Sequence, residues 1–378
     1  MRIPTFFKRY LLPGFVFQSV VIGGGYGTGR ELVEFFLRYG PAGGLVAMVL
    51  VSMVIWSLVA AASFSFAHVF RTYDYRRFLR RLLGRGWVLY EACYLVYLLI
   101  VLAVIAAAAG QILLELFGFP YFVGVLGIMA AVGLVVMGGS GAVERVLATW
   151  SFILYGLYLV LVVLCFRAFG DGILQELAQW DVREGWALAG MRYAGYNLGI
   201  IPAILFVTRH MRSTRDGLVA GGLAGPIAIL PAVLLYLAMV GQYPVIVDRP
   251  VPANFLLDAL GSRPFQLTFQ LVLFGTLVET GAGLIHAVNE RMAGAFRETG
   301  RQMPRVLRPV TALALLAAGT ALSGFGLMDL IARGYGTVTY GFLLLFVLPI
   351  LTLGVHKIRR AGPSSQAGNP LQESEAWP

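Results

Sequence analysis

The sequence predicts an all-α polytopic membrane protein with ten transmembrane helices, arranged as a 5+5 inverted repeat with broken helices 1 and 6. Three observations lead to this fold class. Hydrophobic residues make up 58% of the 378 residues and charged residues only 13%, and a water-soluble protein of this length cannot bury so much apolar surface. Ten windows are long and apolar enough to cross a bilayer, and glycine interrupts two of them.

Each window holds about 20 predominantly apolar residues, the length that crosses the hydrocarbon core of a bilayer. An even number of spans places both termini on one side of the membrane. The predicted spans are residues 11–38, 41–70, 87–117, 121–139, 147–169, 186–208, 217–241, 264–290, 309–324 and 328–356.

Five spans in each half divide the chain into two repeats. The last residues, AGPSSQAGNPLQESEAWP, are small, polar and rich in proline and glycine, which is typical of disorder. The predicted division is a cytoplasmic N-terminus (1–10), a first repeat (11–170), an extracellular connection (171–185), a second repeat (186–357) and a disordered cytoplasmic tail (358–378).

The basic residues predict the orientation. Most of the 29 Lys and Arg residues lie in segments that face the cytoplasm if the N-terminus does, such as RTYDYRRFLRRLLGRG between spans two and three. The net charge of +10 is therefore expected to meet anionic lipid head groups at the cytoplasmic face, and no nucleic-acid-binding motif is present. The expected outer segments contain only Arg38, Arg167, Arg183, Arg249 and Arg263.

The stretch GGGYGTGRE, residues 23–31, interrupts the first span. Glycine weakens helices, and in a bilayer a broken helix survives only where its backbone lines a cavity or binds a ligand. Close helix packing is the alternative, because the stretch contains two G-x-x-x-G pairs. Arg30, beside Glu31, is either functional or paired with Glu34 one turn later.

The stretch YAGYNLG, residues 193–199, lies at the centre of the sixth span, with Pro202 one turn later. The sixth span is the first span of the second half, and the first span begins the first half, so each half begins with an interrupted span. Because five is odd, the second half enters the membrane from the opposite side. Paired interruptions of this kind indicate the central binding site of a transporter. Arg192, before this stretch, either belongs to the site or snorkels to the outer interface.

Broken helices offer binding groups for both signs of charge. The N-termini of half-helices present N–H groups and a positive dipole end to an anion, and their C-terminal carbonyls suit a cation or an ammonium group. One cavity can therefore hold a zwitterion. Tyrosines add aromatic faces, and an asparagine amide can donate and accept. The candidate substrate-binding residues are Gly23, Gly24, Gly25, Tyr26, Gly27, Thr28, Gly29, Glu31, Tyr193, Tyr196 and Asn197.

Ten spans with broken first and sixth helices resemble the LeuT-type fold of the amino acid–polyamine–cation transporter superfamily. Within it, GGGYGTGRELVEFF, YAGYNLG and the HAVNERM of span eight resemble the bacterial YkvI-type membrane proteins, over essentially the whole chain up to the tail. LeuT-type carriers often place an aromatic residue of span three against the substrate. The resemblance therefore adds Tyr94 and Tyr97 to the candidate substrate-binding residues, with core packing as the alternative.

The resemblance also implies an ion site. In sodium-coupled LeuT-type carriers, span eight supplies a small residue, two intervening residues and Thr-Ser, which line up here with Thr276, Glu279 and Thr280. Carbonyls of the first helix, from near Val20 to Gly23, would complete the site. Glu279 replaces a hydroxyl residue, and a buried carboxylate can bind and release a proton. The coupling ion is therefore H+ or Na+, with H+ slightly favoured.

A structural role for Glu279 is the alternative, as a buried acid paired with Arg30 or His286. Other classes of function fit the residues less well. Metal-transporting relatives of the LeuT-type fold carry Asp-Pro-Gly-Asn in the first break and a methionine in the sixth, and this chain has neither. There is no nucleophile–base constellation, no His/Cys metal spacing and no G-x-x-x-x-G-K-[ST] motif. No enzyme activity and no cofactor besides the coupling ion are expected.

The sequence thus predicts an ion-coupled secondary transporter of the bacterial cytoplasmic membrane, with both termini cytoplasmic. Its cargo would be a small zwitterionic or amine-containing solute, an amino acid or an osmolyte, moved by alternating access around the two breaks. A membrane receptor that binds a small ligand on a LeuT-type core is the first alternative, and a channel-like uniporter is the second. The sequence identifies neither the solute nor the oligomeric state.

Overall fold

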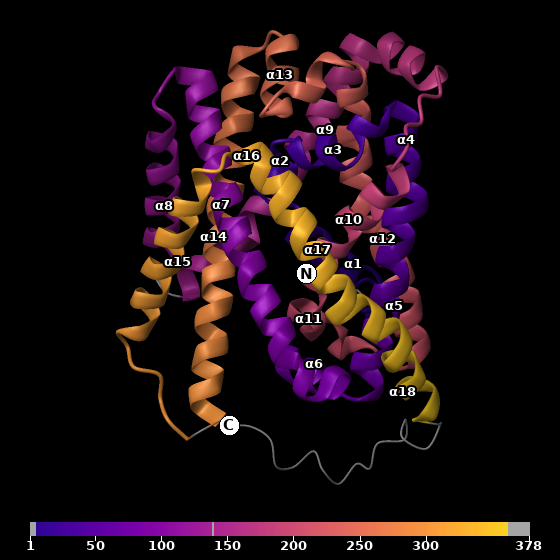
Figure 1. Cartoon of the computed structure of the whole chain (residues 1–378), viewed down its shortest axis with the longest axis vertical. Helices are drawn as coiled ribbons and strands as arrows, with labels where there is room; N and C mark the ends of the chain where they lie inside the picture. Colours follow the sequence, from indigo (N-terminus) through magenta and orange to yellow (C-terminus); the bar gives the residue numbers. More distant parts are fainter. Residues whose placement is uncertain (1–4, 138–139, 299, 362–378) are drawn as a thin grey trace.

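The computed structural model describes residues 5–137, 140–298 and 300–361, and these residues form helices and connections without a β-strand. Within them, six helical stretches are long and apolar enough to cross a membrane. The chain is therefore an all-helical polytopic membrane protein (Figure 1). The six stretches are Pro41–Val69, Tyr75–Phe117, Gly156–Ala178, Thr214–Val240, Arg263–Phe296 and Leu327–Arg360.

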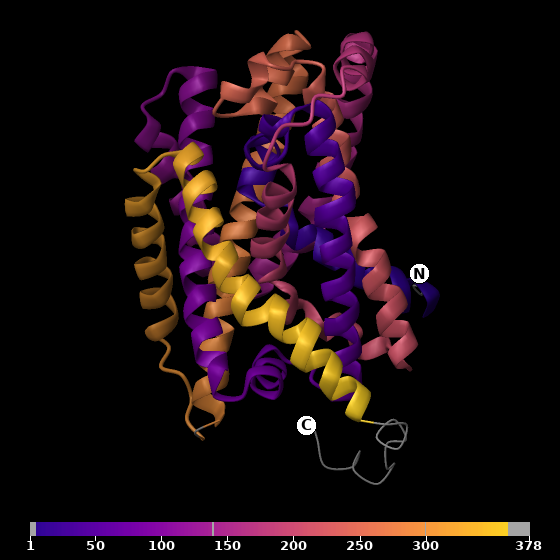
Figure 2. The same ribbon diagram turned by 45° about the vertical axis from the view of Figure 1, so that its right-hand side comes forward.

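The helices of these stretches carry the labels of Figure 1. Two shorter apolar helices, α8 (Tyr121–Met137) and α15 (Leu307–Ser323), lie side by side at one edge of the molecule (Figures 1 and 2). The long stretches contain or overlap α4 (Pro41–Val46), α5 (Met53–Val69), α7 (Trp87–Phe117), α9 (Ser140–Ala178), α12 (Thr214–Val240), α14 (Arg263–Glu298), α16 (Leu327–Asp329), α17 (Gly336–Phe342) and α18 (Val355–Arg360).

The first apolar segment is interrupted twice. Helix α1 (Leu12–Val21) ends at Ile22, whose ψ of 86° leaves the helical region. One turn of helix, α2 (Gly24–Gly27), separates this break from a second one before α3 (Arg30–Phe35). Gly29 has φ 77°, a left-handed conformation that glycine adopts at no steric cost. The glycine-rich stretch is therefore broken, as predicted.

The second interruption lies further along than the sequence predicts. The predicted interruption spans residues 193–199, but α10 (Trp186–Leu198) continues through all of them except Gly199. Asn197 donates its side-chain amide to the carbonyl of Tyr193, one turn back, at 2.9 Å. The break is at Gly199 and Ile200, before α11 (Ile201–Ile204). Gly199 is packed closely against a distant helix, because an added Cβ would lie 2.5 Å from the Phe342 ring.

Small residues allow α5 and α12 to pack closely. Gly217, Gly221 and Gly225 follow one face of α12 at intervals of one turn, and a Cβ at Gly221 would overlap the backbone of Ala61 in α5. Close contact of this kind is how helices associate where water exerts no hydrophobic force. The pair stands beside α1 and supports the first interrupted segment.

Two short helices define the ends of the molecule. Asp74 caps the N-terminus of helix α6 (Tyr75–Leu83), because its carboxylate accepts hydrogen bonds from two backbone N–H groups. The helix buries Phe78, Leu79 and Leu82 on one face and exposes arginines on the other. It lies at the same end as the last turns of α18, opposite α13 (Pro252–Ala259) (Figures 1 and 2). We call these the α6 end and the α13 end.

The described helices also bear on the expected division of the chain. Helix α9 continues to Ala178 and so covers the first part of the connection expected at 171–185. The expected tail begins inside α18, which ends at Arg360. Residues 1–4 of the expected N-terminus and residues 362–378 of the tail lie outside the described residues.

Candidate functional site

A cavity of about 320 Å³ lies beside both interruptions. Its walls come from α1, α3, α7, α10, α11, α14 and the helical turn Leu330–Tyr335 between α16 and α17. Nine residues predicted from the sequence meet in this one space, although they come from four segments far apart in the chain. They are Val20, Gly23, Glu31, Tyr94, Tyr97, Tyr196, Asn197, Glu279 and Thr280.

The other predicted residues lie outside the cavity wall. Gly25, Tyr26, Gly27, Thr28, Gly29, Tyr193 and Thr276 are buried behind it. Gly24 begins α2, and its burial is outside what the structure describes. A Cβ at Gly25 would overlap Glu31 Oε1, and a Cβ at Gly27 would overlap Leu273. These two glycines therefore leave space for neighbouring side chains, which is a packing role. Gly25 also makes room for Glu31, a residue of the cavity wall.

Glu31 is the acidic group of the first interruption. It is the second residue of α3, it is 3% exposed, and it lines the cavity. The hydroxyl of Tyr196 donates to Glu31 Oε2 at 2.6 Å, and the backbone N–H of Tyr26 donates to the same carboxylate. Burial of an ionised carboxylate is unfavourable unless a proton or a cation neutralises it. Glu31 is therefore suited to hold a positively charged group.

Three tyrosine rings pack against one another in the same cavity. We call Tyr97, Tyr196 and Tyr335 the tyrosine cluster. The rings of Tyr196 and Tyr335 are stacked, with centroids 4.5 Å apart, and Tyr97 lies 6.4 Å and 6.1 Å from these two rings. Aromatic faces attract cations, by up to about 2 kcal/mol where water is excluded. The cluster and Glu31 together favour an ammonium group.

Sequence reasoning missed Tyr335, although a signal for it exists. Residues 334–337 read GYGT, the same four residues as 25–28 in the first interruption. The helix around Tyr335 is wide and irregular over Leu330–Tyr335. The repetition of this short motif in two apolar segments identifies Tyr335 as a candidate site residue.

Helix α14 contributes the predicted ion-site residues. Glu279 is 9% exposed and lines the cavity together with Thr280. The hydroxyl of Thr280 donates to the carbonyl of Thr276 at 2.9 Å, and the hydroxyl of Thr276 donates to the carbonyl of Val272 at 3.1 Å. A Cβ at Gly23 would lie 3.9 Å from Thr280, so the first interruption and α14 are neighbours here.

Arg30 contacts the connection around α13 and does not line the cavity. Its guanidinium pairs with Glu34 at 2.9 Å, as the simpler interpretation of its position predicted. It also donates to the carbonyls of Val247 and Arg249, each at 2.9 Å, while the N–H of Ala253 donates to Thr28 at 3.0 Å. These contacts fasten the connection around α13 onto the first interruption.

Arg192 does not reach the cavity either. Its side chain is directed to Tyr340 of α17, with Nη2 2.9 Å from the hydroxyl. This exposed position agrees with the alternative that Arg192 extends away from the site toward an interface.

Comparisons with known proteins agree with this geometry. No protein-family model matches the chain. The chain is 22% identical over 333 residues to the uncharacterized membrane protein YkvI of Bacillus subtilis, which covers 87% of this chain and 92% of that protein. The predicted resemblance to YkvI-type membrane proteins is confirmed.

Among solved structures, a manganese transporter of Eremococcus coleocola is similar, with a TM-score of 0.55 and 16% identity. The match covers 91% of this chain and 78% of that one. At this identity the likeness concerns the fold, and it confirms the expected likeness to the LeuT class of folds. In the part of the chain that the structure describes, no group of three or more His, Cys, Asp or Glu side chains is placed to hold a metal.

Proposed function

We propose that this chain is a secondary transporter that binds the ammonium group of a small amine-containing or zwitterionic solute at Glu31. The observation that carries the proposal is the position of a buried carboxylate beside the tyrosine cluster, in a cavity formed where two helices are interrupted. Among the described residues that line this cavity, two are acidic, Glu31 and Glu279, and none is Lys, Arg or His. Such a lining selects for positive charge.

The size of the cavity supports a small solute. A volume of about 320 Å³ lies at the lower end of the range for small-molecule sites. The ammonium group would contact the Glu31 carboxylate and the faces of the tyrosine cluster. A solute without positive charge would leave Glu31 unneutralised, which disfavours its binding.

The architecture supports movement of that solute across the membrane. The six long stretches, the two shorter helices α8 and α15 and the two interrupted segments fit ten spans in a 5+5 inverted repeat. The likeness to a membrane transporter agrees with this arrangement. Alternating access would then expose the cavity first at one end and then at the other. We place both termini and the arginine-rich α6 end in the cytoplasm of a bacterium, beside anionic lipids.

The coupling ion would bind near Glu279. This carboxylate shares the cavity with Glu31, and the hydroxyls of Thr276 and Thr280 keep their lone pairs available because their protons point to carbonyls of α14. A proton on Glu279 would respond to the charge of the solute. A sodium ion would use the hydroxyl oxygens and the carbonyls from Val20 to Gly23.

An amine fits these residues better than a transition metal does. Manganese is named for the solved transporter, and it prefers carboxylate, carbonyl and water oxygens. Here a tyrosine hydroxyl already binds Glu31 and three aromatic rings surround the space, which suits an organic cation. The sequence motifs of metal carriers are also missing from both interruptions.

Reconstituted protein tests the proposal. Purified protein is screened by thermal shift against amino acids, polyamines and betaines, and the best ligand is then followed in proteoliposomes under an imposed proton or sodium gradient. We expect accumulation against the solute gradient in wild-type protein. In Glu279→Gln, counterflow should persist while gradient-driven accumulation is lost.

Each other outcome has a defined meaning. Binding without flux would indicate a receptor, and flux without gradient dependence would indicate a uniporter. Unchanged accumulation by Glu279→Gln would exclude this carboxylate as the coupling group. A thermal shift with Mn²⁺ but with no amine would overturn the assignment of the solute class.

A further inference from the structure

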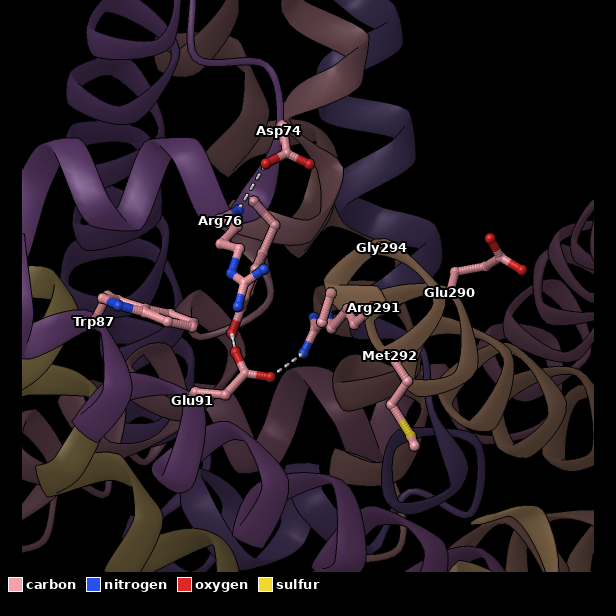
Figure 3. Close-up of a pocket in the computed structure, with 10 residues that line it drawn as sticks. Asp74, Arg76, Trp87, Glu91, Glu290, Arg291, Met292 and Gly294 are labelled. Carbon is pink, nitrogen blue, oxygen red and sulfur yellow. Dashed lines mark hydrogen bonds and ion pairs between the residues drawn. The ribbon is translucent and has the colours of Figure 1, made fainter. Parts of the chain in front are cut away.

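A second and larger cavity lies nearer the α6 end than the first. Its volume is about 510 Å³, and it lies between α6, α7 and α14 (Figure 3). On α7 the first cavity is lined by Tyr94 and Tyr97 and the second by Trp87 and Glu91, on successive turns. On α14 the lining passes in the same way from residues 279–287 to residues 290–295. The two cavities therefore follow one line along the same two helices.

The guanidinium of Arg291 lies at the junction. It sits between two tyrosine rings, 3.9 Å from the centroid of Tyr75 and 4.1 Å from that of Tyr94. Its Nη1 atom is 3.6 Å from Glu91 Oε1, an ion pair that is longer than a hydrogen bond (Figure 3). Arg291 therefore occupies a compartment made of a carboxylate and two aromatic faces.

This compartment repeats the chemistry of the first site. In both places a tyrosine hydroxyl donates to a glutamate at 2.6 Å: Tyr196 to Glu31 in the first site and Tyr75 to Glu91 in the second. In both places further tyrosine rings complete the lining. Tyr94 lines the first cavity and also contacts Arg291, so one ring belongs to both compartments. The difference is that the protein itself supplies the cation of the second compartment.

We propose that Tyr75, Tyr94 and Glu91 form a second binding site for an organic cation, filled by the Arg291 side chain in this structure. The inference rests on the proposed function in one respect, since the transported ammonium group would be the cation that replaces Arg291 on its way to the α6 end. Arg291 then blocks the passage while no solute is present. Replacement keeps one positive charge in the compartment, so the half-buried Glu91 always has a cationic partner.

The Arg291 contacts are suited to such an exchange. The side chain of Arg291 is 19% exposed and that of Glu91 25%, so neither is locked inside the protein. The ion pair is loose, and ring contacts are less directional than hydrogen bonds. Helix α6, which carries Tyr75, is fixed at its other end to α18, because Lys357 donates to the carbonyl of Arg81 at 2.7 Å. The second site is thus assembled before a solute arrives.

Deletion of the side chain tests the site directly. Arg291→Ala removes the equivalent of ethylguanidinium, so ethylguanidinium is the probe. Calorimetric titration of purified protein should show one additional equivalent bound by Arg291→Ala relative to wild-type protein. Addition of Glu91→Gln should weaken this extra binding at least tenfold. Arg308→Ala, which breaks an exposed pair with Glu290 at 2.8 Å, is the matched control and should gain no equivalent.

A second measurement uses wild-type protein and so does not depend on the folding of a variant. Tetramethylammonium should displace Arg291 from the rings, and phenylglyoxal labelling of Arg291, quantified by peptide mass spectrometry, should rise at least threefold. Labelling of Arg308 in the same sample should stay constant. No additional ethylguanidinium in Arg291→Ala, or unchanged Arg291 labelling in wild-type protein, would overturn the second site.

These measurements separate the second site from the proposed function. Binding to Arg291→Ala and labelling of Arg291 are read in detergent, without a membrane gradient or a transported solute. A protein that failed to accumulate any amine in proteoliposomes would still show the additional equivalent. Conversely, a true transporter with no second site would accumulate solute but bind no additional probe.

Discussion

The two interrupted segments differ in what they bring to the cavity. The first, from Ile22 to Gly29, is broken twice and precedes Glu31 on a six-residue helix. The second is broken once, at Gly199, and its preceding helix presents Tyr196 and Asn197. The first segment therefore provides the charge, and the second provides an aromatic face and the hydroxyl that orients that charge.

This difference indicates how the site is divided. Gly25 of the first segment makes room for the Glu31 carboxylate itself, whereas Gly195 and Gly199 of the second make room for Thr339 and Phe342 of α17. A change in the first segment should therefore alter the chemistry of binding. A change in the second should alter mainly packing and stability.

Glu31→Gln should have the largest effect, because it removes the charge and leaves the shape. The amide still accepts the hydrogen bond from Tyr196, so the fold should persist. We expect affinity for the amine identified by thermal shift to fall by about 3 kcal/mol, roughly a hundredfold in Kd. Calorimetry measures this change, with the exposed Glu184→Gln as the control. Equal affinities of wild type and Glu31→Gln would contradict a role for Glu31.

The same substitution in the two segments should have unequal effects. Gly25→Ala places a methyl group against the Glu31 carboxylate, whereas Gly195→Ala places one 2.7 Å from Thr339 Cγ2. Overpacking costs about 1–3 kcal/mol of stability in either case. We expect Gly25→Ala to weaken amine binding at least tenfold and Gly195→Ala to lower Tm with less than a threefold change in Kd.

A matched control exists for this pair. At Gly23 a Cβ would lie 3.9 Å from Thr280, an ordinary contact, so Gly23→Ala should bind nearly as wild type does. If Gly195→Ala weakens binding as much as Gly25→Ala, the division between the two segments is wrong.

Tyr196→Phe should weaken amine binding less than Glu31→Gln does. It deletes the hydroxyl that donates to Glu31 at 2.6 Å but retains the ring that stacks on Tyr335. The loss of one hydrogen bond to a charged group is about 1.5 kcal/mol, or roughly tenfold in Kd. Tyr196→Leu also removes the ring and should weaken binding further. Equal affinities of the phenylalanine and leucine variants would exclude a cation–ring contact.

The sequence by itself determined the environment, the helical class and nine of the residues that line the cavity. Apolar runs of membrane length require helices, because a bilayer offers no partner for free backbone groups. Glycine-rich breaks in such runs marked the first interruption, and the nine predicted residues that line one cavity came from these breaks and from spans three and eight. Local composition was sufficient because each of these features is set within one segment.

Only the tertiary structure decided how the segments meet. Helix α10 continues through Asn197, whose amide donates to a carbonyl one turn back, and it ends before Gly199, which packs against Phe342 of a distant helix. Tyr335 enters the site, and Arg291 lies between Tyr75 and Tyr94, through contacts between residues more than a hundred positions apart. Side-chain partners across helices depend on packing distances and helix rotation, which no single segment of the chain encodes.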